Sequence, residues 1–223
     1  RFAGWGTSLV WFANATGAFC VQELGATPEV RVIAIGARGA QFCKGRDRGG
    51  ESTAGMTAWD MRVKMMGVVL DLYKAIADAP VPVVACVHGD AIGVGAALAV
   101  GCDITLAAAH ARFAFPEIEH DMPATLAMCA ATGKVQSKAL LHLIYSGESI
   151  DAAEAVRVGL VSKALPSASF AAETEAYVHK LSGRSRLTLE TIKRYHRHAA
   201  QLSPEMASEY AGTLLALVRS AKS

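Results

Sequence analysis

Residues 86 to 117 read CVHGDAIGVGAALAVGCDITLAAAHARFAFPE, and this stretch decides the fold. An apolar run ends at His88, and glycines at positions 89, 93 and 95 break the chain before a helical pattern starts at Ala96. At such a turn, backbone N–H groups at the start of the helix point at a ligand oxygen, and the helix dipole adds positive potential. One carboxylate, Glu117, follows in a Pro-Glu step. The pattern favours an anion-stabilising turn combined with an acid or base.

A second glycine-containing turn lies upstream, where Phe42 to Asp47 reads FCKGRD after the apolar run Val30 to Ile35. Runs of β-branched residues bounded by turn residues, here residues 30–35 and 83–87, are typical of buried parallel strands. If both turns follow parallel strands of one sheet, each can supply one N–H to the same oxygen.

The alternation of strand and helix patterns predicts an α/β protein. A long helix is expected over Thr57 to Ala79, with Met61, Met65, Val68, Leu72 and Ile76 on one face and the ion pairs Asp60/Lys64 and Lys74/Asp78 elsewhere on its surface. Residues 44–56 have no apolar periodicity and predict a mobile loop. Further elements are expected as strands at 8–12 and 104–107, and as helices at 15–24, 96–100, 170–181, 187–198 and 204–218.

Composition narrows the class of protein. The chain has 223 residues, and its hydrophobic content of 52% excludes general disorder. Its formal net charge of +2 is too small to produce a long-range electrostatic field that would attract nucleic acid or an anionic membrane. No apolar run reaches the roughly 18 residues of a membrane span. The five cysteines are scattered without CxxC spacing, so we expect neither a disulfide framework nor a metal site. A reducing cytosol or organelle matrix fits best, and we expect the cytoplasm.

Four ordered blocks carry a resemblance to a known family: residues 29–47, 82–104, 111–118 and 146–166. On these blocks the chain resembles the enoyl-CoA hydratase/isomerase (crotonase) superfamily. The resemblance implies a crotonase-like ββα spiral over residues 1–166, and a C-terminal helical oligomerisation region over 167–223 that builds homotrimers or hexamers. Family members normally have further strands and a helix before the first block, whereas only residues 1–27 precede it here.

The resemblance also implies a site. The thioester oxygen of an acyl-CoA would accept hydrogen bonds from the N–H groups of Arg46 and Val94, and Glu117 would be the general acid or base. Val94 stands where the family usually has glycine. Contacts with the substrate or its CoA moiety are expected from Lys44, Gly45, Asp47, Ile92, Gly93 and Gly95. No cofactor beyond that CoA moiety is expected. Without the family blocks, these glycines would indicate only close packing of helix on strand.

The hydratases of the family use a second carboxylate, and the matching position here is Ala97. Hydration uses two carboxylates to hold and activate water, whereas moving a double bond needs one base, so the sequence favours isomerisation. The first alternative is a hydratase, hydrolase or decarboxylase that uses other acid or base residues, with His120, Asp121, His88 and Asp90 as candidates. The second alternative is a catalytically weak CoA-binding or assembly module. The sequence does not identify the acyl group or the pathway.

Overall fold

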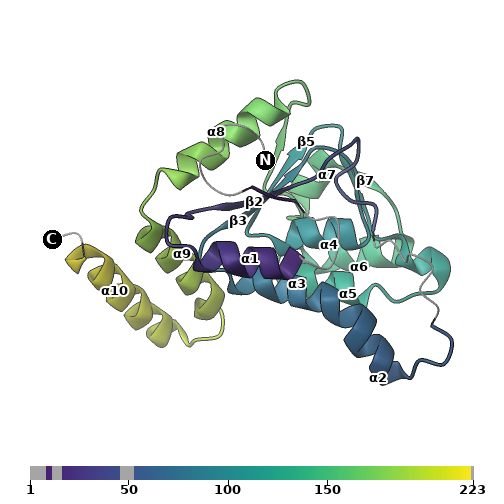
Figure 1. Ribbon diagram of the computed structural model, residues 1–223, viewed down its shortest axis with the longest axis horizontal. Helices are drawn as coiled ribbons and strands as arrows, with labels where there is room; N and C mark the ends of the chain where they lie inside the picture. The colour runs from purple at the N-terminus through teal and green to yellow at the C-terminus, as the bar shows by residue number, and fades with distance from the viewer. Residues whose placement is uncertain (1–8, 12–16, 46–52, 222–223) are drawn as a thin grey trace.

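The structure is a computed structural model that describes residues 9–11, 17–45 and 53–221. Figure 1 shows a central sheet with helices on both faces and a helical hairpin at the C-terminus. The strands are β1 (Leu9–Trp11), β2 (Ile33–Gly36), β3 (Val83–Val87), β4 (Ala91–Ile92), β5 (Ile104–Ala108), β6 (Arg112–Ala114), β7 (Ile150–Asp151) and β8 (Lys163–Leu165). The α-helices are α1 (Gly17–Ala26), α2 (Ala58–Asp60), α3 (Gly67–Asp78), α4 (Val94–Gly101), α5 (Thr125–Ala131), α6 (Ser137–Ser146), α7 (Ala152–Arg157), α8 (Phe170–Ser182), α9 (Arg186–Ala199) and α10 (Pro204–Ser220).

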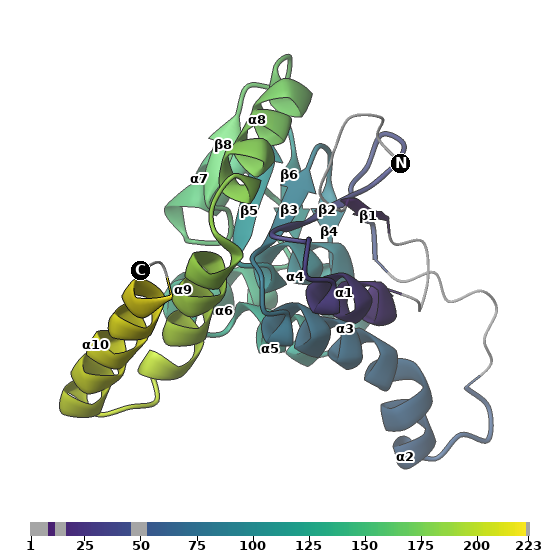
Figure 2. The ribbon, with the colours of Figure 1, turned by 60° about the vertical axis from the view of Figure 1, so that its left-hand side comes forward.

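The larger sheet has five parallel strands in the order β1-β2-β3-β5-β8. Alternate residues of its strands face opposite sides, as the pleat of a strand requires. Ile33 and Ile35 pack with Val21 of α1 and Val69 of α3, whereas Val32 and its alternate neighbours pack with residues of α8 and α9. Figure 2 shows α8 on one side of this sheet and α1, α3 and α4 on the other. Both faces are therefore buried, which confirms the predicted buried parallel strands at 30–35 and 83–87.

A second, smaller sheet has three strands in the order β4-β6-β7, and none of them pairs with a strand of the larger sheet. Strands β4 and β6 are parallel, with Ala91 opposite Phe113 and Ile92 opposite Ala114. Strand β4 runs directly into the glycine turn at Gly93, and β6 runs into a 3₁₀ helix, η2 (Pro116–His120), which carries Glu117. This small sheet therefore brings the two functional segments of residues 86–117 together.

The predicted helix at 57–79 forms as a continuous helix made of α2, a π-helical segment η1 (Met61–Met66) and α3. Thr57 caps its start with a capping box to Asp60, and the ion pairs Asp60/Lys64 and Lys74/Asp78 form. The predicted buried face is confirmed at Met65 and Ile76, which are buried, and is wrong at Val68. Val68 is 38% exposed, and Val69 and Tyr73 are buried in its place.

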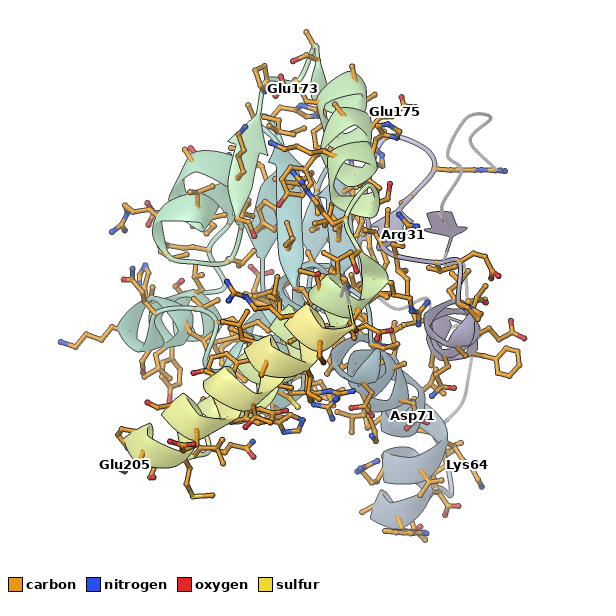
Figure 3. All side chains as sticks on the ribbon, turned by 90° about the vertical axis from the view of Figure 1, so that its left-hand side faces the viewer. Arg31, Lys64, Asp71, Glu173, Glu175 and Glu205 are labelled. Atoms are coloured by element: carbon orange, nitrogen blue, oxygen red, sulfur yellow. The ribbon has the colours of Figure 1, made fainter. Side chains whose placement is uncertain are left out.

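The C-terminal helices α9 and α10 form a hairpin that is anchored through cations of α9. The Arg186 guanidinium donates to the carbonyl oxygen of Gly25, in the last turn of α1, and to those of Thr27 and Val30, which follow this helix. Lys193 Nζ donates to the carbonyl oxygens of Ile76 and Val81 at 2.9 and 3.2 Å. Such cations satisfy carbonyl groups left free at helix ends. In Figure 3, Glu205 at the start of α10 and Lys64 on η1 mark two helical parts that extend from the molecule at separate places.

The other predicted elements are confirmed with shifted ends. The strand at 104–107 is β5, the segments at 8–12 and 15–24 are β1 and α1, and the three C-terminal helices are α8, α9 and α10. Strands β4, β6, β7 and β8, helices α5 to α7 and η2 were not predicted. The expected loop at 44–56 falls partly outside the described residues, so its mobility stays a prediction, as does the division of the chain at residue 166. Within the described part of the chain, no helix is long and apolar enough to cross a membrane.

Candidate active site

The two glycine turns lie against each other at the start of β4. The Ile92 N–H donates to the Cys43 carbonyl oxygen at 2.8 Å, and Cys43 forms a parallel bridge with Ala91. Gly95 lies directly on this segment, because a Cβ on Gly95 would collide with the Cys43 carbonyl and lie 2.7 Å from the Cys43 Cβ. Only glycine permits so close an approach of the two backbones. The packing interpretation of Gly95 is thus correct, and this packing positions the site.

Helix α4 begins at Val94, directly after the turn. Gly93 adopts φ +55°, which L side chains rarely allow, and so supplies the unusual backbone angle that Val94 does not need. As the first residue of α4, Val94 has no partner for its N–H inside the helix, and no acceptor for it is found among the described residues. A half-buried N–H at the positive end of a helix dipole is suited to an oxyanion.

Glu117 lies directly opposite this turn. The Gly93 N–H donates to the Ala114 carbonyl at 2.8 Å, which ties the turn to the end of β6 three residues before Glu117. A Cβ on Gly93 would lie 3.2 Å from Glu117 Oε1. The other carboxylate oxygen, Oε2, is buried and has no hydrogen-bond partner among the described residues. The carboxylate is therefore held beside the helix start and is directed inward.

One further polar group lies buried near this carboxylate and was missed from the sequence. The Tyr73 hydroxyl, from α3, is buried without a hydrogen-bond partner among the described residues. Burial raises the pKa of Tyr73, and the charge of Glu117 raises it further. The available signal was spacing, because Tyr73 stands four residues after Val69 and three before Ile76 on the apolar face of the helix.

The predicted CoA-binding residues are only partly described. Lys44 is exposed, and Gly45 has φ +108°, with its Cα facing the Ile92 carbonyl. Arg46 and Asp47 lie outside the described residues, so the second N–H donor is not placed. Ile92, Gly93 and Gly95 are brought together with Val94 and Glu117 by the small sheet. A role in binding CoA stays a prediction for all of them.

The four auxiliary candidates fall into two pairs. His88 Nε2 lies 2.9 Å from the Gly39 carbonyl oxygen, and Asp90 Oδ1 accepts from the Arg112 N–H at 3.2 Å, so both side chains join loops. His120 and Asp121 are exposed at the end of η2, where Asp121 has a left-handed φ of 52°. The Asp121 side chain lines an open cavity between η2, α5 and α6.

An open cavity of about 410 Å³ begins at the residue after Glu117. Glu117 and Val94 do not line it. Its wall is formed by η2, α5 and α6 and is mostly apolar, with Ile118, Met122, Pro123, Ala124, Met128, Leu141, Ile144 and Tyr145 among its residues. A volume in this range suits a small organic group. Ala97, at the position of the family's second carboxylate, is fully buried in α4 and supplies no charge.

Comparisons with known proteins show what this chain is similar to. The family model described as enoyl-CoA hydratase/isomerase matches residues 17–219. The chain is 31% identical over 158 residues to mouse enoyl-CoA hydratase domain-containing protein 3, mitochondrial, covering 71% of this chain and 52% of the relative. It is 28% identical to the (E)-benzylidenesuccinyl-CoA hydratase of Thauera aromatica, over 82% of this chain and 69% of the relative.

Among solved structures, an enoyl-CoA hydratase from Mycobacterium smegmatis superposes with a TM-score of 0.84 at 28% identity, covering 91% of this chain and 78% of that one. These comparisons confirm the expected crotonase-like α/β fold with a parallel sheet and C-terminal helices. The chain spans about half the length of the mouse relative that it matches.

Proposed function

This chain belongs to the enoyl-CoA hydratase/isomerase family, and from that premise we propose that it forms an enolate from an acyl-CoA thioester, with Glu117 as the base. The observation that carries the proposal is the juxtaposition at Gly93. A carboxylate oxygen lies beside the turn whose next N–H, that of Val94, is free at a helix start. A base next to an oxyanion donor is the arrangement that proton removal beside a carbonyl requires.

In this mechanism Glu117 takes the proton from the carbon next to the thioester carbonyl. The electron pair of the C–H bond forms the carbon–carbon double bond of the enolate, and the π pair of the carbonyl moves onto the thioester oxygen. The Val94 N–H and the N–H of Arg46, which lies outside the described residues, would donate to that oxygen. Loss of one such donor typically costs about 2.7–4 kcal/mol of transition-state stabilisation. The apolar cavity beside η2 is our proposed place for the acyl chain.

We infer that the enolate is reprotonated by the same carboxyl group at the γ carbon, which moves a double bond. The supporting observation is Ala97, which is buried and apolar where a hydratase of the family has its second carboxylate. Hydration is the second candidate, favoured by the hydratase names of the relatives. Incubation with 3-enoyl-CoA and 2-enoyl-CoA distinguishes the two, because an isomerase interconverts them whereas a hydratase adds 18 mass units of water to the latter.

Exchange of the α proton of a saturated acyl-CoA in heavy water tests the base directly. We expect Glu117→Gln to lower the exchange rate by about 10²–10⁴-fold, the usual contribution of a general base. Glu119→Gln is the matched control, because Glu119 is exposed on the same 3₁₀ helix. Exchange at the wild-type rate in Glu117→Gln excludes that residue as the base. Binding of acyl-CoA without any exchange in the wild-type protein selects the weak CoA-binding module instead.

Assembly and location are further parts of the proposal. We propose a homotrimer or hexamer built through the C-terminal region, supported by exposed apolar side chains on α9 and α10 such as Ile192, Leu215 and Leu217. Sedimentation equilibrium tests the number of subunits. All five cysteines are free, which supports a reducing compartment, the cytoplasm in our proposal.

A further inference from the structure

Tyr73 carries a buried polar group that the proposed mechanism does not use. Its side chain comes from the inward face of α3 and is 8% exposed, and its hydroxyl has no hydrogen-bond partner among the described residues. An unsatisfied buried hydroxyl is destabilising, and native proteins seldom keep one unless a ligand or water completes it. A phenylalanine would fill the same space without that cost, so the hydroxyl needs an explanation.

Glu117 Oε2 is another such atom, since it too is buried and has no hydrogen-bond partner in the described part of the chain. The two atoms do not bond to each other, yet the charge of Glu117 acts on Tyr73. Burial and this charge both raise the pKa of Tyr73, so its hydroxyl stays protonated near neutral pH and is available as a donor. The other groups that act on Tyr73 are the thiols of Cys129 and Cys43. An ionised carboxylate, in contrast, only accepts.

We propose that Tyr73 is a positioning residue of the acid–base site, and that its hydroxyl and Glu117 Oε2 share one oxygen ligand between them. This inference rests on the proposed function and deepens it. The shared oxygen has to accept a hydrogen bond from Tyr73 and donate one to the carboxylate. Water and an alcohol group have both capacities, whereas a thioester carbonyl has no hydrogen to donate.

Such a ligand assigns different tasks to the two carboxylate oxygens. Oε2 is held from the α3 side, and Oε1, which lies beside Gly93, is left free to exchange protons with the substrate. The hydrogen bond also favours the charged form of the carboxyl group, which is the form that acts as a base. Tyr73 would thus act through Glu117 and would not contact the reacting carbon.

The test is α-proton exchange in Tyr73→Phe across a range of pH, with Tyr177→Phe on α8 as the matched control. We expect the maximal exchange rate to fall about tenfold with KM within about twofold, as for the loss of one hydrogen bond to a charged group. The acid limb of the profile should move to higher pH by about half a unit or more. Tyr177→Phe should leave rate, KM and profile unchanged.

A merely structural tyrosine gives another result. Because the Tyr73 hydroxyl has no partner among the described residues, the thermal unfolding midpoint of free Tyr73→Phe should fall little. An unchanged pH profile and rate overturn the proposal, and a marked loss of stability without those changes shows that the hydroxyl has a structural role only. If instead Glu117→Gln exchanges at the wild-type rate, the proposed function fails, independently of Tyr73.

A second measurement identifies the source of the shared oxygen. The affinities for 3-hydroxybutyryl-CoA and butyryl-CoA are compared in the wild-type protein and in Tyr73→Phe. If the ligand is a substrate hydroxyl, the wild-type protein prefers the hydroxy compound by about tenfold and the variant loses this preference. If the ligand is water, neither protein has a preference while the shift of the pH profile remains. Both results support the shared oxygen, and a preference equal in both proteins contradicts it.

Discussion

The larger and the smaller sheet differ in what their strands carry. Strands β2 and β3 of the larger sheet are buried on both faces by aliphatic side chains, and their packing joins α1 and α3 to one side and α8 to the other. Strands β4 and β6 of the smaller sheet are two and three residues long, yet each leads directly into a residue of the candidate site. Both sheets contribute to the core, but only the smaller one leads into the candidate site, so mutations in the two should have separable effects on activity.

The sharpest test of this separation compares an alanine substitution at Gly95, in the first turn of α4 beside the smaller sheet, with one at Gly36 in the larger sheet. Gly95→Ala would force the Cys43 backbone away from α4, whereas a Cβ on Gly36, at the end of β2, meets nothing within 4 Å. Because displacement of a catalytic group by about 1 Å costs on the order of 10²-fold, we expect a loss of that size in α-proton exchange for Gly95→Ala. Gly36→Ala should stay within about twofold. Equal exchange rates in the two variants would break the comparison.

A smaller effect is expected in the core of the larger sheet. Ile35 is 1% exposed, and Ile35→Val removes one buried methyl group, which typically costs about 0.5–1.5 kcal/mol in the free energy of unfolding. Urea unfolding measures this loss. The exchange rate per folded molecule should not change, because Val94 and Glu117 of the candidate site lie on α4 and η2 and not on β2. A fall in that rate of more than about tenfold would show that the larger sheet also tunes the chemistry.

The smallest effect concerns the ion pair between Asp78 of α3 and Arg197 of α9. Hydrogen bonds from Lys74 lower the pKa of Asp78, and Arg197 lowers it further, at 2.5 Å. A carboxyl group with a lowered folded-state pKa stabilises the protein above its ordinary pKa of 3.8, and this contribution is lost as the pH falls through the lowered value.

Since the pair is partly exposed, Asp78→Asn should cost only about 0.5 kcal/mol at pH 7 and nothing once the pH is below both pKa values. Thermal unfolding at the two pH values measures the difference. Asp71→Asn, on an exposed position of the same helix, is the control and should show no such pH dependence. A cost for Asp78→Asn that is the same at both pH values would contradict this assignment.

The sequence predicted the larger sheet and the long helices well, because buried parallel strands and amphipathic helices leave a periodic pattern. The strands of the smaller sheet are too short to leave one, and their pairing depends on contacts such as that of Gly95 with Cys43. The proximity of Glu117 to Gly93 followed only from the family resemblance. Tyr73 was missed because the predicted face ran through Val68 and Leu72, whereas Val69 and Tyr73 are the buried neighbours of Ile76 on this helix.

The contact of Gly95 with the Cys43 segment also bears on how this protein could be redesigned. A side chain at position 95 would have to separate two loops that are distant in the chain, so this turn offers no gradual route to new specificity. The cavity wall beside η2 is different, since Ile118, Met122 and Leu141 are each partly open to solvent and can change size one at a time. Laboratory selection for bulkier substrates should therefore accumulate replacements along that wall and leave the glycine untouched.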